Sequence, residues 1–157
     1  MIWLRGEYSL VDDREKLDLG AITALLHSTY WAANRPREVI ARTLHHSLNF
    51  GLFWRGRQIG FARVVTDHAT VGYLCDVVIA PEHRGKGLGG WLLETLLNHP
   101  NLRTCRIDLF TKDAQEFYRE FGFVPHKYTN LVRYPPDYAG GGDVTQGTEL
   151  SPQFPSG

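Results

Sequence analysis

Apolar residues in the first third of the chain recur every three to four positions, which is the spacing of a helix packed on one side. Asp18 is a favoured N-cap residue, and the periodic side chains after it predict a helix from Asp18 to about Tyr30. A second helix is expected to begin at Asn34 and Pro36, because proline fits the first turn of a helix. Both helices should bury one face against a core.

The apolar pattern in the middle of the chain is that of strands. Aromatic and β-branched residues form short runs separated by turn residues, which is typical of hairpins. A short strand is expected over Tyr8–Val11, followed later by three in a row over Phe50–Trp54, Gln58–Thr66 and Val71–Ala80. The third of these ends in successive apolar residues, which indicates burial on both faces of a sheet.

The second half alternates between helices and strands. Repeated leucines predict a helix over Gly89–Asn98, after a glycine-rich turn. The pattern then predicts a strand over Cys105–Phe110, a helix over Asp113–Phe121 ended by Gly122, and one or two last strands from Phe123 to about Tyr134.

This order of elements predicts an α/β fold with one mixed sheet. The three consecutive strands should be antiparallel, because hairpins join them. The helix between Val71–Ala80 and Cys105–Phe110 should make those two strands parallel. We therefore expect a single domain over residues 1–134, with a largely antiparallel sheet and helices on both faces. Residues 135–157 are mostly small, polar or proline, and predict a loosely ordered tail.

Charge and composition narrow the class of partner. The 17 basic and 17 acidic residues cancel, so the chain lacks the signature of a protein that binds nucleic acid or an anionic membrane. No apolar stretch approaches the ~20 residues of a membrane helix, and no signal peptide is evident. The two cysteines fit a reducing compartment, so a cytoplasmic location is expected. The seven histidines are scattered, so no metal site is expected.

The segment Arg84–Gly90 is the clearest candidate for a ligand site. It has four glycines in six residues and lies between a buried strand and an apolar helix. Glycine lets the backbone approach a ligand closely, and the unpaired N–H groups at a helix start favour an anion. Lys86 adds a positive charge. A phosphate or pyrophosphate is the expected ligand, and a purely structural turn is the alternative.

Two phosphate-binding motifs overlap in this turn. Gly85-x-Gly87-x-x-Gly90 matches the dinucleotide fingerprint, in which the first glycine follows a strand directly. Here four residues intervene, so a dinucleotide-dependent oxidoreductase is the least favoured alternative. A Walker A loop is excluded, because Lys86 is followed by glycine rather than serine or threonine.

The second motif is Arg84-x-x-Gly87-x-Gly89, which resembles the coenzyme A motif of the GNAT superfamily of N-acetyltransferases. Residues 114–123, Ala-Gln-Glu-Phe-Tyr-Arg-Glu-Phe-Gly-Phe, are similar to the closing helix of that family. The order of motifs and elements agrees over roughly Tyr8 to Tyr134. The resemblance implies acetyl-CoA as the cofactor. It also implies a sheet that splays between the fourth and fifth predicted strands to admit the pantetheine arm.

The resemblance implies roles for individual residues. Tyr118 would protonate the leaving thiolate, backbone groups of Val77 and Ile79 would bond the pantetheine arm, and Ala114 would face the cofactor. Thr111 stands where many members of the family have an asparagine. The residues expected to bind the cofactor are Val77, Ile79, Arg84, Gly85, Lys86, Gly87, Leu88, Gly89, Gly90, Thr111, Ala114 and Tyr118.

An amine that attacks a thioester must lose a proton, and an alkylamine has a pKa near ~10.4, so a base is useful. Asp76 is the candidate, because a charge inside an apolar strand is rare unless it is paired or functional. The alternative is that Asp76 accepts hydrogen bonds from a loop or pairs with an arginine. Glu82 and Asp67 are weaker candidates.

Three aromatic residues, Tyr30, Trp31 and Trp54, are candidate walls of an acceptor pocket, where they would suit a cationic amine. Ordinary core packing is the alternative for all three. The sequence thus predicts an N-acetyltransferase that acts by direct attack on acetyl-CoA, with a small-molecule primary amine as its substrate. A non-catalytic acyl-CoA-binding module is the alternative, and a homodimer would be ordinary for such a fold.

Overall fold

A six-stranded sheet forms the centre of the computed structural model, which describes residues 1–136. The strands lie side by side in chain order, and all neighbours are antiparallel except β5 and β6, which are parallel. The strands are β1 (Ile2–Arg5), β2 (Tyr8–Val11), β3 (Leu48–Trp54), β4 (Arg57–Thr66), β5 (Val71–Ile79) and β6 (Arg106–Leu109).

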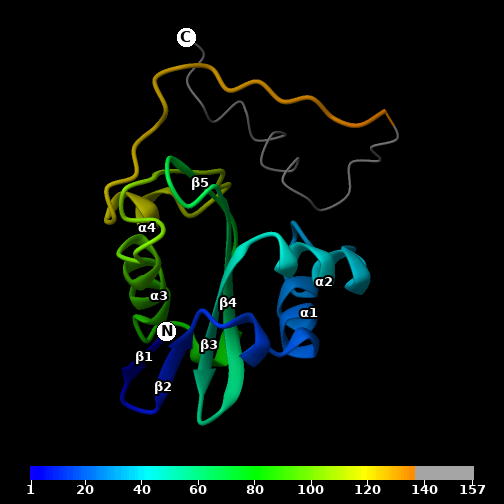
Figure 1. The fold of residues 1–157 in the computed structure, drawn as a ribbon, viewed down its shortest axis with the longest axis vertical. Coiled ribbons are helices and arrows are strands. Elements are labelled where there is room, and N and C mark those ends of the chain that lie inside the picture. The colour runs from blue at the N-terminus through cyan, green and yellow to red at the C-terminus, as the bar shows by residue number, and fades with distance from the viewer. Residues whose placement is uncertain (137–157) are drawn as a thin grey trace.

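Helices cover both faces of this sheet. Figure 1 shows α1 and α2 on one side of the strands and α3 and α4 on the other. The α-helices are α1 (Leu19–His27), α2 (Arg37–His45), α3 (Leu88–Leu97) and α4 (Gln115–Arg119), and two short 3₁₀ helices are η1 (Arg14–Lys16) and η2 (Pro81–His83). The mixed α/β fold predicted from the sequence is confirmed.

The helix starts and packed faces follow from local sequence. The Asp18 side chain accepts a hydrogen bond from the Ala21 N–H at 3.0 Å, as its N-cap position predicts. Buried leucines and isoleucines line the inner faces of α1 and α3, and between residues 1 and 136 no helix is long and apolar enough to cross a membrane. The core therefore lies on both faces of β3, β4 and β5.

The sheet opens between β5 and β6. These strands pair only from Val71 to Leu74 on β5, and β5 then continues to Ile79 alongside β4 alone. The register between β4 and β5 also shifts between Arg63 and Val64, which is a β-bulge. The second half of β5 thus has one edge free of β6, at the place where the splay is predicted.

Two predictions of strands need correction. β1 was not predicted, because its apolar residues Ile2 and Leu4 are exposed and only pairing with β2 makes it a strand. Conversely, residues 123–134 form no strand, although one or two were predicted there. Val124 and Leu131 are exposed in this segment, and a strand needs both a paired neighbour and a buried face. Of the predicted tail, everything from Asp137 onward lies outside the described residues.

Candidate functional site

The glycine-rich turn joins the end of β5 to the start of α3. Gly85 and Gly87 have φ angles of 73° and 70°, a left-handed conformation that favours glycine. Gly87 is the N-cap residue of α3. The Arg84 side chain donates a hydrogen bond from Nε to the Ile79 carbonyl at 2.9 Å. The turn is therefore anchored to the strand that precedes it.

The start of α3 is suited to hold an anion. The first helical N–H groups, those of Leu88, Gly89 and Gly90, have no partner within the helix, and no side chain caps them at Gly87. The Lys86 side chain is exposed beside them. Arg5, from β1, brings a guanidinium close by and donates to the Gly87 carbonyl at 3.1 Å. Sequence reasoning missed Arg5, because β1 itself was missed.

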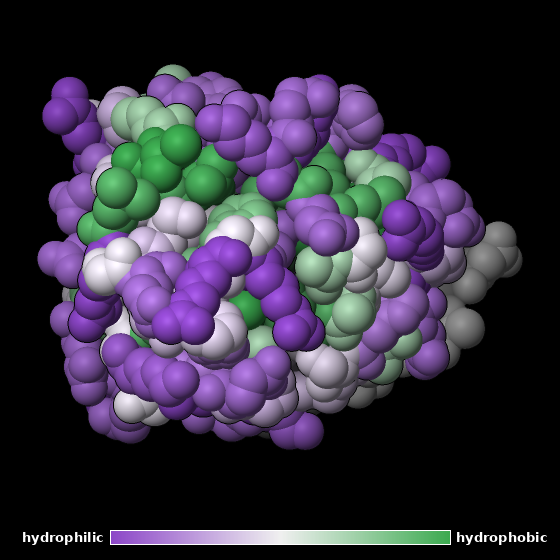
Figure 2. Space-filling view, turned by 90° about the horizontal axis from the view of Figure 1, so that it is seen from below, coloured by the Kyte–Doolittle hydropathy of each residue, from purple (hydrophilic) through white to green (hydrophobic). Residues whose placement is uncertain are grey.

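This end of the molecule is open to solvent. Figure 1 places the β1–β2 and β3–β4 turns and the start of α3 at its lower end, and Figure 2 shows that end from below. Hydrophilic side chains predominate on this face, with apolar ones gathered in separate patches between them. A charged ligand can therefore reach the glycine turn from water.

The start of α4 holds three of the residues implied by the family resemblance. The Thr111 hydroxyl accepts a hydrogen bond from the Ala114 N–H at 3.0 Å, and the Ala114 carbonyl accepts one from the Tyr118 N–H at 3.1 Å. Gly90, on α3, lies so close to the segment after α4 that an added Cβ would be 3.4 Å from Phe121. The Thr111 hydroxyl thus fixes the first turn of α4, which supports Tyr118.

Tyr118 is half-buried between aromatic rings. Its ring meets those of Phe117 and Phe123 at centroid distances of 5.1 and 5.7 Å. Burial, together with the charges of Tyr30 and Asp113, raises the pKa of Tyr118 to about 12. The hydroxyl therefore carries its proton at neutral pH, which is the form that can donate a hydrogen bond.

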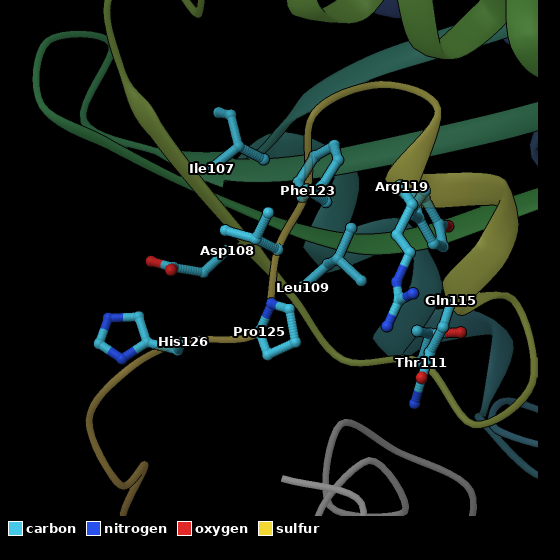
Figure 3. Close-up of a pocket in the computed structure, with 11 residues that line it drawn as sticks. Ile107, Asp108, Leu109, Thr111, Gln115, Arg119, Phe123, Pro125 and His126 are labelled. Carbon is cyan, nitrogen blue, oxygen red and sulfur yellow. The ribbon is translucent and has the colours of Figure 1, made fainter. Parts of the chain in front are cut away.

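A cavity of about 130 Å³ lies beside Tyr118. Ile107 and Leu109 of β6, Thr111 and Arg119 are among its lining residues, and Figure 3 shows Phe123 close to them. The segment 123–126 closes the cavity along the outer edge of β6, where the sequence predicted a further strand. The cavity therefore lies at the edge of the sheet, between β6 and this segment.

Asp76 is a buried, ion-paired carboxylate. It is 1% exposed. It accepts from Arg63 Nε at 2.7 Å, from Arg35 Nη1 at 3.2 and 3.3 Å, and from Trp31 Nε1 at 3.0 Å. Burial alone would raise the pKa of Asp76, but the charges of Arg63 and Arg35 outweigh it and lower that pKa. The geometry favours the alternative in which Asp76 pairs with arginine over its role as a base.

The three predicted aromatic walls do not lie together. Tyr30 and Trp31 are in contact, with ring centroids 5.1 Å apart. Trp54 instead packs on His83 at 5.2 Å. Asn49 on β3 pairs with Arg63 on β4, and Arg63 pairs with Asp76 on β5, the residue that binds Trp31. Trp54 lies five residues beyond Asn49 on β3, which is about 17 Å at ~3.4 Å per residue. Tyr30 and Trp31 therefore lie together, whereas Trp54 lies toward the glycine turn.

Several polar residues of the site were not predicted from the sequence. Arg35 and Arg63 are the partners of Asp76, and Asp113 lies near both Tyr30 and Tyr118. The Lys112 backbone hydrogen-bonds the Tyr30 hydroxyl, and its ammonium lies 5.4 Å from the centre of the Tyr30 ring. The one signal in the sequence was the carboxylate of Asp76 inside an apolar strand, which indicated that it has a buried partner. Among residues 1–136 no group of acidic, histidine and cysteine side chains could hold a metal.

Comparison with known proteins agrees with this geometry. Residues 45–125 match the family model described as an acetyltransferase (GNAT) domain. A protein of Gibberella zeae assigned as an acetyltransferase is 35% identical over 150 residues, which cover 76% of this chain and 85% of that protein.

Solved structures show the same fold. One from Xanthomonas campestris pv. campestris, assigned as an acetyltransferase of the GNAT family, is 39% identical with a TM-score of 0.79, and the match covers 85% of this chain and 96% of that one. N-acetylglutamate synthase from Neisseria gonorrhoeae, solved with coenzyme A and N-acetyl-glutamate, is 19% identical with a TM-score of 0.62. That match covers 75% of this chain and 28% of the synthase, and it concerns the fold alone.

Proposed function

The chain belongs to the GNAT family of acetyltransferases, and from this premise we propose that it transfers the acetyl group of acetyl-CoA to a primary amine of a small molecule. The observation that carries the proposal is the pairing of an anion-binding turn with an opening in the sheet. The turn Arg84–Gly90 and the free edge of β5 adjoin one another, and together they suit a long phosphorylated cofactor.

The residues present fit coenzyme A. The N–H groups from Gly85 to Gly90 would hold its pyrophosphate, with Lys86 as a cation. Backbone groups of β5 beyond Leu74 would bond the pantetheine arm as an added strand. Val77 is better suited than Ile79 to this contact, because the Ile79 carbonyl already accepts from Arg84.

The reaction moves one proton from the amine and one to sulfur. Acetyl-CoA supplies an acetyl thioester: the amine nitrogen bonds to its carbonyl carbon, the carbon–sulfur bond breaks, and the thiolate takes up a proton. Tyr118 is the proposed donor to that sulfur. Its pKa of about 12 lies above the ~8.5 of a thiol, so a hydrogen bond that strengthens as charge develops is its main contribution.

The proton that the amine loses needs an acceptor, and Asp76 is poorly placed to accept it. Both oxygens of Asp76 already accept hydrogen bonds from buried donors. Asp113 is exposed, and its charge acts on Tyr30 and Tyr118, so the acceptor side of the site lies within its reach. Asp113 is therefore a candidate to take this proton through water.

A thiol-release assay with a panel of primary amines tests the proposal. The wild type should release free coenzyme A from acetyl-CoA when the correct amine is present. Tyr118→Phe should lower turnover by about 10²-fold, the low end for loss of a general acid, and leave the affinity for acetyl-CoA unchanged. Tyr128→Phe, which removes the hydroxyl of an exposed tyrosine, is the matched control and should keep wild-type turnover.

Two other outcomes of this assay would lead to different conclusions. Binding of acetyl-CoA without thiol release for any amine would contradict the enzyme and favour a non-catalytic acyl-CoA-binding module. Full turnover by Tyr118→Phe would remove Tyr118 from the mechanism but leave the transferase intact.

A further inference from the structure

The buried carboxylate of Asp76 connects two parts of the molecule that are distant in sequence. Arg63 lies on β4, directly opposite Asp76 in the sheet, whereas Trp31 and Arg35 lie in the connection between α1 and α2. All three side chains donate to the same carboxylate. Asp76 is therefore the point at which residues 28–36, the α1–α2 connection, are tied to the sheet.

From this arrangement we propose that Asp76 is a positioning residue, which holds the α1–α2 connection on β5 and thereby places Tyr30 beside Tyr118 at the acceptor site. This inference rests on the transferase function proposed above, and it assigns Asp76 a role other than proton transfer.

The carboxylate has no room for a further proton donor. An ionised carboxylate offers about four lone-pair sites on its two oxygens. The Asp76 oxygens accept four contacts: two from Arg35, one from Arg63 and one from Trp31. The side chain is also inaccessible to solvent. A substrate amine would have to displace a buried arginine in order to give its proton to Asp76.

One aromatic contact, between Trp31 and Tyr30, connects Asp76 to the surroundings of Tyr118. Asp76 fixes the Trp31 indole through Nε1, and Trp31 meets the Tyr30 ring edge-on, at 84°. Tyr30 is 45% exposed, and its hydroxyl hydrogen-bonds the Lys112 backbone in the loop between β6 and α4. Tyr30 is also close enough to raise the pKa of Tyr118. Elements from opposite faces of the sheet thus meet at Tyr30 and Tyr118.

Hydrogen bonds hold the rest of the α1–α2 connection together, so a displacement of the connection at Asp76 should also displace Tyr30. His27 Nε2 hydrogen-bonds the Arg35 carbonyl at 2.7 Å, and the Arg35 N–H donates to the Ala32 carbonyl at 3.1 Å. The connection would therefore move as a unit and carry Tyr30 with it.

Trp31→Phe tests this inference, because it removes one donor to Asp76 and keeps an aromatic ring. We expect the KM for the amine to rise about tenfold, since small displacements of positioning groups have large kinetic effects. The KM for acetyl-CoA and the pH at which kcat/KM is half-maximal should not change. Trp3→Phe, at a half-buried tryptophan packed on Phe50 and His99, is the control and should behave as the wild type.

Asp76→Asn separates positioning from proton transfer. This change leaves two buried arginines without their counter-charge, so circular dichroism must first show that the variant folds. If it folds, positioning predicts a raised KM for the amine and an unchanged acid limb of the pH profile. Loss of that limb, with a fall in kcat of ~10² or more, would overturn the inference and make Asp76 the base.

The inference and the proposed function fail differently. If the wild type releases no thiol with any amine, the transferase function fails. If the wild type is active and Trp31→Phe keeps the wild-type KM for the amine, the positioning role is refuted while the function stands. If Asp76→Asn does not fold, the Trp31→Phe result alone decides.

Discussion

At the scale of single residues, chemistry depends on the partners that the fold supplies. Asp67 and Asp76 were both candidate bases by residue type. Hydrogen bonds from the Thr70 hydroxyl and from backbone N–H groups of its own turn lower the pKa of Asp67, whereas arginine charges lower that of Asp76. A carboxyl whose pKa is lowered holds a proton weakly, so neither is adapted to act as a base near neutral pH.

Cys75 provides a prediction at this scale. Burial raises the pKa of its thiol to about 11, so the nucleophilic thiolate is scarce below pH 9. In the native protein, iodoacetamide should therefore label Cys105 before Cys75 at pH 8, and the rate at Cys75 should increase steeply only as the pH approaches 11. Mass spectrometry of the peptides measures both sites. In urea the two cysteines should react alike, and equal labelling of the native protein at pH 8 would refute the prediction.

At the scale of elements, the glycine turn shows how local conformation creates a binding site. Gly87 has a positive φ and also begins α3, so one residue sets both the turn and the direction of the helix. A side chain there would strain the backbone and displace the N–H groups that the cofactor would use. Gly56, in the β3–β4 hairpin, has a similar φ of 80° but lies in a different turn.

Replacing each of these two glycines by alanine separates an effect on the stability of the fold from an effect on cofactor binding. Each change should cost about 1–2 kcal/mol, because alanine is disfavoured at positive φ. Acetyl-CoA at ~100 times its Kd should add about 2.7 kcal/mol, which is a rise in Tm of roughly 5–11 °C for a domain of this size. That rise should persist in Gly56→Ala and shrink in Gly87→Ala at the same ligand concentration. A full rise in Gly87→Ala, measured by thermal unfolding, would mean that the cofactor does not use this turn.

At the scale of the whole molecule, two carboxylates, one buried and one partly buried, join distant segments. Asp76 ties the α1–α2 connection to the sheet. Asp12, at the end of β2, pairs with the N-terminal amine and with His99, which follows α3, at 3.0 Å. Burial would raise the pKa of Asp12, but hydrogen bonds from the N-terminus and His99 lower it. Both links therefore depend on ionised carboxylates.

Acid should weaken these links. A carboxyl whose pKa is lower in the folded than in the unfolded protein stabilises the fold above the unfolded value, ~3.9, and loses that effect as the pH falls through the folded value. The free energy of unfolding, measured by urea titration, should therefore fall from about pH 5 downward. Asp12→Asn should make this fall shallower, whereas Asp13→Asn, at a half-exposed residue beside it, should not. An identical slope in Asp12→Asn would contradict the assignment.

The sequence by itself determined the features that depend on neighbours along the chain. Hydrophobic periodicity predicted four helices and five of the six strands, and Asp18 marked the start of α1. The glycine pattern predicted the turn before α3, because left-handed residues and an open helix start are local properties. The family resemblance, the mixed sheet and the acetyltransferase activity class follow from the same short-range motifs.

Only the tertiary structure decided which residues meet across long distances. Arg35 reaches Asp76 across 41 positions and Arg5 reaches Gly87 across 82, and no local pattern marks either pair. The same holds for β1, which depends on pairing with β2, and for residues 123–134, which find no strand partner. The residue types in the sequence were enough to select the candidates. Only their hydrogen-bond partners and charges showed that Asp76 belongs to an ion pair, and that Tyr30, rather than Trp54, lies near Tyr118.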